Sequence, residues 1–237
     1  MKRNSIIGAF VLCALCICVV GEGSASAAGL TGLDCIPNEL GKGDFEDLHC
    51  TNPEPGKGAF TRVPLAANEP IEGVGEGTSI LKATVGGNEI KITCTGFTSM
   101  GHLTNSETAG VMTATSNDTV ITYTGCTVDN PPGCTIPGGT ITTQALHSEA
   151  IAGTPNTVQF RPAEGTKFFG LTLENCTNSS LNKTYPLTGE ITAEASGSML
   201  TTTGTAGGKL KVAGQTAELM TTASVYVTGT TETTSLE

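Results

Sequence analysis

Apolar and polar residues alternate along most of the chain beyond residue 58. The segment 89–94 reads Glu-Ile-Lys-Ile-Thr-Cys, so every second side chain is apolar. Successive side chains of a β-strand point to opposite faces of its sheet, and this run therefore places two isoleucines and a cysteine on one face. Similar runs recur at intervals of roughly 8 to 15 residues between Gly, Pro, Asn or Thr clusters, and those at 88–95 and 98–104 are predicted as separate strands.

The spacing of these runs predicts an all-β fold. No window beyond the N-terminal region keeps the i, i+3, i+4, i+7 spacing of an amphipathic helix. We expect a single antiparallel β-sandwich or barrel-like domain. A β-solenoid is the alternative, although no fixed period of about 20 to 30 residues recurs. The expected core residues are Ile90, Ile92, Ile121, Tyr123, Ile141, Leu171, Leu173, Ile191, Val225 and Val227.

An N-terminal signal peptide is predicted over residues 1–27. Lys2 and Arg3 form a basic start, residues 6–20 form an apolar run, and residues 25–27 read Ala-Ser-Ala, a cleavage pattern. The apolar run is shorter than the roughly 20 residues that a membrane-spanning helix needs. We therefore expect a protein that is secreted, extracellular or associated with the cell wall, with no membrane span after cleavage.

The mature chain is predicted to hold one β-domain over residues 58–228. Residues 28–57 are rich in Gly, Pro, Asp and Glu, and we expect them to form a loop-rich flap closed by a disulfide. Residues 229–237 are expected to form a flexible tail. The length of the mature chain suits one large domain with its own core and requires no second one.

Six of the nine cysteines follow the predicted signal peptide. An even number of cysteines in an exported chain predicts disulfides, here three of them. One bridge is expected within the flap, which has no other means of holding its shape, one across a short loop, and one over a long segment. The expected pairs are Cys35–Cys50, Cys126–Cys134 and Cys94–Cys176, with Cys176 beyond a strand end or after a bulge.

The mature chain is strongly acidic. Removing residues 1–27 leaves ten basic and twenty-one acidic residues, a net charge of −11. Such a surface repels phosphate backbones, so nucleic acid is not an expected partner. The expected partner is an extracellular ligand or a component of the cell envelope that the sequence does not identify.

The histidines offer little catalytic chemistry. His49, His102 and His147 lie about fifty residues apart, and no H-E-x-x-H zinc motif is present. The segment His147-Ser148-Glu149 contains the residue types of a hydrolytic triad, but adjacent residues of a strand point to opposite faces. We expect these three side chains to be surface residues and expect no activity that depends on histidine.

Acidic residues offer the one alternative chemistry. The segment Asp44-Phe-Glu-Asp47 could meet Ca²⁺, but the full loop pattern of a calcium site is missing, so a solvated turn is expected. Carboxylate pairs in a cleft hydrolyse glycosides, usually beside aromatic platforms, and this chain has no tryptophan. The acids considered are Glu149, Glu164, Glu174 and Glu190. No motif for a cofactor or a metal is present, so none is expected.

Several motifs occur together in one order along the chain. They are Cys94-Thr-Gly, Gly101-His-Leu-Thr104, Tyr123-Thr-Gly-Cys126 with Cys134, the run 139–146, Arg161-Pro-Ala-Glu-Gly165 with Phe168, and Cys176 followed by Leu187-Thr-Gly-Glu190. Over residues 29 to 228 the chain thus resembles a group of secreted proteins of unknown function from high-GC Gram-positive soil bacteria. The resemblance implies export, a β-rich fold and bridged cysteines, and it implies no activity.

The sequence leaves two functional hypotheses. The first is an exported, non-enzymatic binding module or a structural module of the cell envelope, because a disulfide-bonded β-scaffold carries no catalytic motif. The alternative is an extracellular hydrolase that acts through carboxylates. Acidic side chains gathered in one pocket would favour the hydrolase.

Overall fold

The computed structural model describes residues 30–108, 111–151, 154, 156–204, 209–228 and 234–236. These residues form two antiparallel β-sheets and two short 3-10 helices, Pro137–Gly139 and Ser179–Leu181, with no α-helix. The all-β, antiparallel prediction is confirmed. None of the helical segments in this part of the chain has the length and apolar character to cross a membrane. The predicted signal peptide, residues 1–27, lies outside the described residues.

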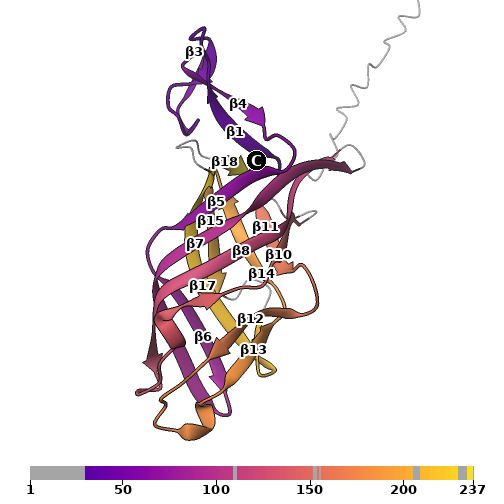
Figure 1. Ribbon diagram of the computed structural model, residues 1–237. Helices are drawn as coiled ribbons and strands as arrows, with labels where there is room; N and C mark the ends of the chain where they lie inside the picture. The colour runs from indigo at the N-terminus through magenta and orange to yellow at the C-terminus, as the bar shows by residue number, and fades with distance from the viewer. Residues whose placement is uncertain are drawn as a thin grey trace, which may run out of the picture.

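A small sheet of five strands lies at one end of the molecule (Figure 1). In spatial order it comprises β18 (Thr234–Leu236), β1 (Gly32–Pro37), β4 (Phe60–Pro64), β2 (Gly43–Phe45) and β3 (Pro53–Gly58). Within the expected loop-rich flap, residues 28–57, three strands alternate with turns, and the Cys35–Cys50 disulfide closes the segment as expected. The expected flexible tail, residues 229–237, contributes a strand, since β18 pairs with residues 32–34 of β1. Pairing between segments this far apart leaves no local pattern in the sequence, so the strand at 234–236 could not be predicted from it.

The second sheet contains thirteen strands. They are β5 (Glu69–Gly75), β6 (Ser79–Val85), β7 (Asn88–Thr108), β8 (Val111–Asn130), β9 (Ile141–Thr142), β10 (Leu146–Ala150), β11 (Thr157–Pro162), β12 (Lys167–Thr172), β13 (Thr184–Thr188), β14 (Ile191–Ser196), β15 (Met199–Gly204), β16 (Lys211–Val212) and β17 (Gln215–Val227).

The large sheet closes on itself twice. Beside the small sheet, eight strands pair in the closed order β17-β15-β14-β11-β10-β8-β7-β5, which we call the near ring. At the other end, the order β17-β6-β7-β8-β9-β12-β13-β16 forms the far ring, in which the bridge between Thr143 and Phe169 joins β9 to β12. Strands β7, β8 and β17 run through both rings (Figure 1). The fold is thus barrel-like.

Strand β7 is longer than the sequence predicts. We expected separate strands at 88–95 and 98–104, with a break near Gly96, but one strand covers both. Gly96 lies opposite Thr124 of β8, and a Cβ atom at Gly96 would collide with the Thr124 side chain. The glycine therefore permits a close approach between paired strands rather than a turn.

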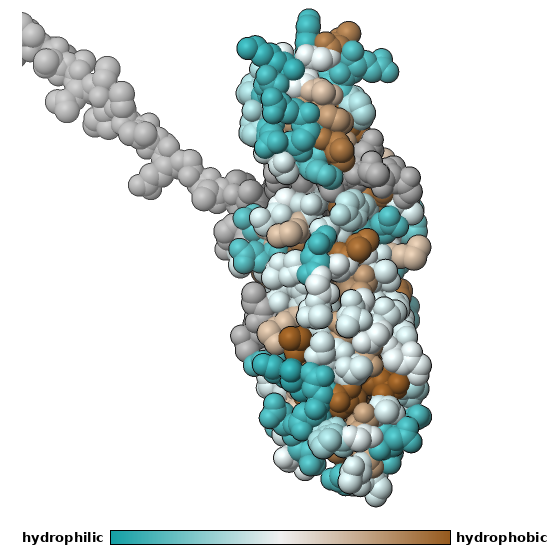
Figure 2. Space-filling model, turned by 90° about the vertical axis from the view of Figure 1, so that its left-hand side faces the viewer, coloured by the Kyte–Doolittle hydropathy of each residue, from teal (hydrophilic) through white to brown (hydrophobic). Residues whose placement is uncertain are grey.

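The two rings share a wall but differ in their interiors. All ten residues expected in the core are buried. The far ring is filled by large side chains, including Phe168, Phe169, Leu171 and Leu187, each almost fully buried. On the face shown in Figure 2, residues of intermediate hydropathy make up much of the outer wall, strongly hydrophilic residues lie on the small sheet and toward the opposite end, and a few hydrophobic patches lie between them. Threonine supplies much of this wall, since its β-branched side chain suits a strand and its hydroxyl suits water.

All six described cysteines form disulfides, but two of the expected pairs are wrong. Cys35–Cys50 is present as expected, whereas the other two bridges are Cys94–Cys126 and Cys134–Cys176. Cys94 and Cys126 lie directly opposite each other where β7 pairs with β8. Local composition does not predict that register, because β8 continues through Gly125, a residue type that usually marks a turn.

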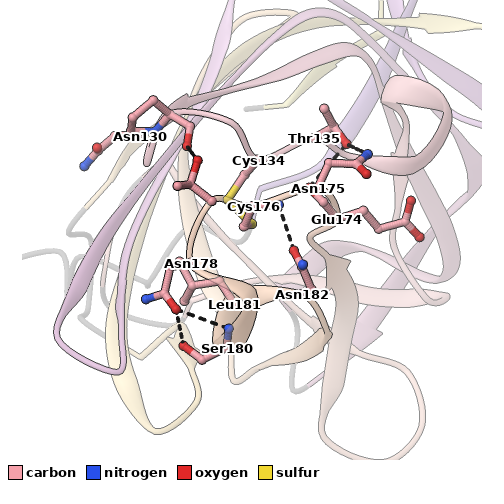
Figure 3. Close-up of a disulfide and its surroundings, with 12 residues drawn as sticks. Asn130, Cys134, Thr135, Glu174, Asn175, Cys176, Asn178, Ser180, Leu181 and Asn182 are labelled. Carbon is pink, nitrogen blue, oxygen red and sulfur yellow. Dashed lines mark hydrogen bonds between the residues drawn. A yellow bond between two sulfur atoms is a disulfide. The ribbon is translucent and has the colours of Figure 1, made fainter.

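The Cys134–Cys176 bridge ties the segment after β8 to the segment after β12 (Figure 3). The two chains meet at an isolated antiparallel bridge between Thr135 and Glu174. Asn182 accepts a hydrogen bond from the Cys176 backbone N–H at 2.8 Å, and this bond holds the loop in place. Cys176 lies beyond the end of β12 at Thr172, as the apolar parity of that strand predicts.

Replacing both Cys134 and Cys176 with alanine is expected to destabilise the protein strongly. The bridge spans a sequence separation of 42 residues, and constraining such a loop in the unfolded chain contributes about 4 kcal/mol on a chain-entropy estimate. Urea unfolding of the double variant measures the loss. Peptide mapping without reduction should recover Cys94 joined to Cys126, and a map that joined Cys94 to Cys176 would contradict this fold.

Candidate functional site

The residues of the apparent triad segment fall on both faces of β10. Ser148 is buried and faces the interior of the near ring, whereas His147 and Glu149 lie on the outside. His147 Nε2 lies 3.2 Å from Glu149 Oε2, and Arg161 approaches the same carboxylate at 3.5 Å. The strand geometry therefore separates the serine hydroxyl from the imidazole beside it.

A β-bulge on the outer wall brings two of the three histidines to neighbouring positions. The register of β8 shifts opposite both β7 and β10, and the bulge turns Asn117 and Asp118 outward together. His102 Nδ1 lies 2.6 Å from Asp118 Oδ2, and His147 Nδ1 lies 2.5 Å from Asn117 Oδ1. His49 belongs to the segment between β2 and β3 of the small sheet.

Asp118 is the electrostatic centre of this outer cluster. Partial burial opposes its ionisation, but hydrogen bonds from the ring and backbone of His102 and from the Ser116 hydroxyl hold the pKa of Asp118 below its usual value. The Ser116 hydroxyl and the His102 imidazole thus meet the same carboxylate rather than each other. A serine activated for attack would instead need its hydroxyl paired with the imidazole.

The remaining acidic candidates do not converge. Asp47 accepts hydrogen bonds from the backbone N–H groups of His49, Thr51 and Asn52, which close a turn of the small sheet. Glu190 pairs with Lys209 and accepts a hydrogen bond from Gln159. Within the described ranges, no three His, Cys, Asp or Glu side chains gather as a metal site would require.

The interior of the near ring contains an apolar cavity of about 70 Å³. It exists because residues that point inward here are small, among them Ala114, Ser148, Ala193 and Ala223. Eight strands enclose an interior that side chains can just fill or that can hold one small ligand. The larger lining residues include Phe97, Ile121, Tyr123, Phe160, Ile191 and Leu200. No residue that lines this cavity carries a charge at neutral pH.

Some hydroxyl groups of the cavity wall bond within the protein, whereas two that are fully buried have no partner. Thr119 bonds to Ser116 at 2.8 Å, and Thr202 donates to the Leu219 carbonyl at 2.8 Å. Tyr123 Oη and Thr234 Oγ1, in contrast, are buried with no hydrogen-bond partner. Burial raises the pKa of Tyr123, so its hydroxyl stays protonated and remains a donor.

Residues from both ends of the described chain cover the cavity beside the small sheet. Leu30 and Thr234 line it there, and the Leu30 carbonyl accepts a hydrogen bond from Ala114 N at 2.7 Å. The Asn105 side chain holds the Gly32 backbone through two bonds of 2.8 Å, accepting from its N–H and donating to its carbonyl. The Asn105 side-chain amide thus pairs with the Gly32 backbone as a neighbouring strand would, and the two bonds fix this cover to β7.

The sequence did not reveal this cavity. Its signal was present in the small residues at inward positions, such as Ala193 on β14 and Ala223 on β17, where other strands carry Ile, Leu or Phe. These small residues can be recognised as the lining of one cavity only when the strand pairing shows which inward-pointing side chains lie at the same height along the ring.

Comparisons of the chain with models of known families, with curated proteins and with solved structures found no match.

Changing Asp118 to Asn should make the protein less stable near neutral pH. A carboxyl group whose pKa is lowered by folding stabilises the protein above its unfolded-state pKa, near 4, and this contribution disappears as the pH falls. The cost should be about 0.2 to 1 kcal/mol, as for other exposed ion pairs. Urea midpoints measured from neutral pH down to pH 3 should converge for the wild type and the variant. Glu107→Gln, which removes the same charge from an exposed position of β7, should leave the midpoint unchanged at every pH.

Proposed function

We propose that this chain is an exported, non-enzymatic binding module that takes one small, mostly apolar molecule into the near ring. The observation that carries the proposal is the apolar cavity enclosed by eight paired strands. A cavity left unfilled weakens a fold, here by roughly 2 kcal/mol for about 70 Å³. A ligand that fills it recovers part of that loss through contact with the wall.

Export is supported by the chemistry of the cysteines. All six cysteines of the described residues are oxidised, and such bridges persist in oxidising compartments. The basic start and apolar run of residues 1–27 agree with that location. A role in binding is further supported by the wall chemistry, since it offers apolar contact and hydroxyl groups but no acid-base pair.

The proposal predicts uptake of small apolar probes at the cavity. Titration with cyclopentane and toluene should shift backbone amide resonances of lining residues such as Ala193 and Val158, and should raise the melting temperature by mass action. Ala193→Leu places a larger side chain in the cavity and should abolish both effects while keeping or raising the melting temperature of the free protein.

Two changes on the same strand serve as controls. Glu194→Leu adds the same side chain to the exposed outer face of β14 and should leave uptake of the probes intact. Ala195→Leu faces inward at a packed position outside the cavity wall, and overpacking there should cost about 1 to 3 kcal/mol. Wild-type protein that binds neither probe, or Ala193→Leu protein that binds both as the wild type does, would refute the proposed site.

A further inference from the structure

We infer that the cavity selects an uncharged molecule with one hydrogen-bond acceptor, and that the acceptor is bound by the hydroxyl of Tyr123. This inference rests on the proposed function and adds the chemical class of the ligand. It follows from a polar atom in the cavity wall that the protein leaves without a partner.

The structure fixes the ring of Tyr123 firmly. Tyr123 lies on β8 directly opposite Phe97 of β7, and the two rings meet edge to face with their centres 5.4 Å apart. Its side chain is 2% exposed and separates the cavity from a void of about 10 Å³ that reaches Phe169 in the far ring. A donor held in this way is preorganised, so a ligand need not order it on binding.

The absence of a partner for Tyr123 contrasts with the other buried tyrosine of the core. The hydroxyl of Tyr185 donates to the Leu181 carbonyl at 3.3 Å, and that of Thr202 donates to the Leu219 carbonyl. Buried polar groups in folded proteins are nearly always satisfied, and one that is not weakens the fold. The Tyr123 hydroxyl is enclosed by protein atoms in the free protein, so a ligand acceptor that satisfies it must displace a neighbouring side chain to reach it.

The wall chemistry also defines the charge of the ligand. Because burial raises the pKa of Tyr123, the group is a neutral donor throughout the physiological range. The lining residues include no Lys, Arg or His that could pair with an anion and no Asp or Glu that could pair with a cation. An isolated charge buried in such a wall would be strongly disfavoured, whereas a ketone, ether or ester oxygen needs only the one donor.

Matched pairs of probes test the inference. Cyclopentanone and methylenecyclopentane have the same shape and differ in an oxygen for a methylene group, as do acetophenone and α-methylstyrene. Benzoate provides an anionic probe of similar size. Dissociation constants are measured by amide-resonance titration for the wild type and for Tyr123→Phe. The readout is the ketone-to-alkene affinity ratio, because it cancels the general gain from filling the cavity.

Tyr123→Phe should lower the ketone-to-alkene affinity ratio by about threefold to tenfold, the worth of one hydrogen bond, and should leave alkene affinity unchanged. Its melting temperature should stay the same or rise, since the lost hydroxyl had no partner. The matched control is Tyr185→Phe, which removes a bonded hydroxyl from the same core. It should lower the melting temperature and leave the affinity ratio at the wild-type value.

The possible failures are distinguishable. Wild-type protein that binds no probe would overturn the proposed function together with this inference. Binding of both ketone and alkene with the same affinity ratio in Tyr123→Phe would leave the cavity as a ligand site and overturn the inference alone. Benzoate bound as tightly as acetophenone would overturn the assignment of a neutral ligand. Loss of the ratio in Thr234→Val but not in Tyr123→Phe would show that the donor is the other unpartnered hydroxyl.

Discussion

The structure depends on the hydrogen bonding of β17 along both of its edges. One edge pairs first with β16 and then with β15, and the other pairs first with β6 and then with β5. Each ring closes through this strand, so neither ring leaves an edge open to another chain at this position. Around the rest of the wall only β7 and β8 are also continuous. The other positions are filled by separate short strands, one set for the near ring and one for the far ring.

Because both rings have eight strands, they have similar widths, and the difference between their interiors comes from side-chain size. Phenylalanine and leucine fill the far ring, whereas alanine and serine leave the near ring hollow. Tyr123 stands at the boundary and lines the spaces on both sides of it. The packed far ring and the Cys94–Cys126 bridge hold this part of β8 in place, and with it the backbone that carries Tyr123.

The sequence predicted what depends on local alternation and missed what depends on pairing. Period-two patterns identified the strands of the core, and all ten expected core residues, from Ile90 to Val227, are buried. The disulfide partner of Cys94 depends on the register of long strands that continue through glycine, which local composition reads as a break, and that of Cys176 depends on an isolated bridge between two segments beyond their strands. The cavity was missed for the same reason, since Ala193 and Ala223 look like ordinary small strand residues until β14 and β17 are placed around one ring.

The cover beside the small sheet is a part of the cavity wall that belongs to neither ring. Separating two strands of a closed ring breaks a ladder of hydrogen bonds, and separating β7 from β8 opens both rings because that pairing belongs to both. The cover is held by the two Asn105 bonds to Gly32, by the bond from Ala114 to Leu30, and by the three-residue pairing of β1 with β18. Parting two neighbouring strands of the near ring opens that ring, whereas displacing Leu30 and Thr234 breaks these bonds and leaves both rings closed. Exchange of a ligand would follow that path, and the small sheet would then control access to a cavity whose shape the rings define.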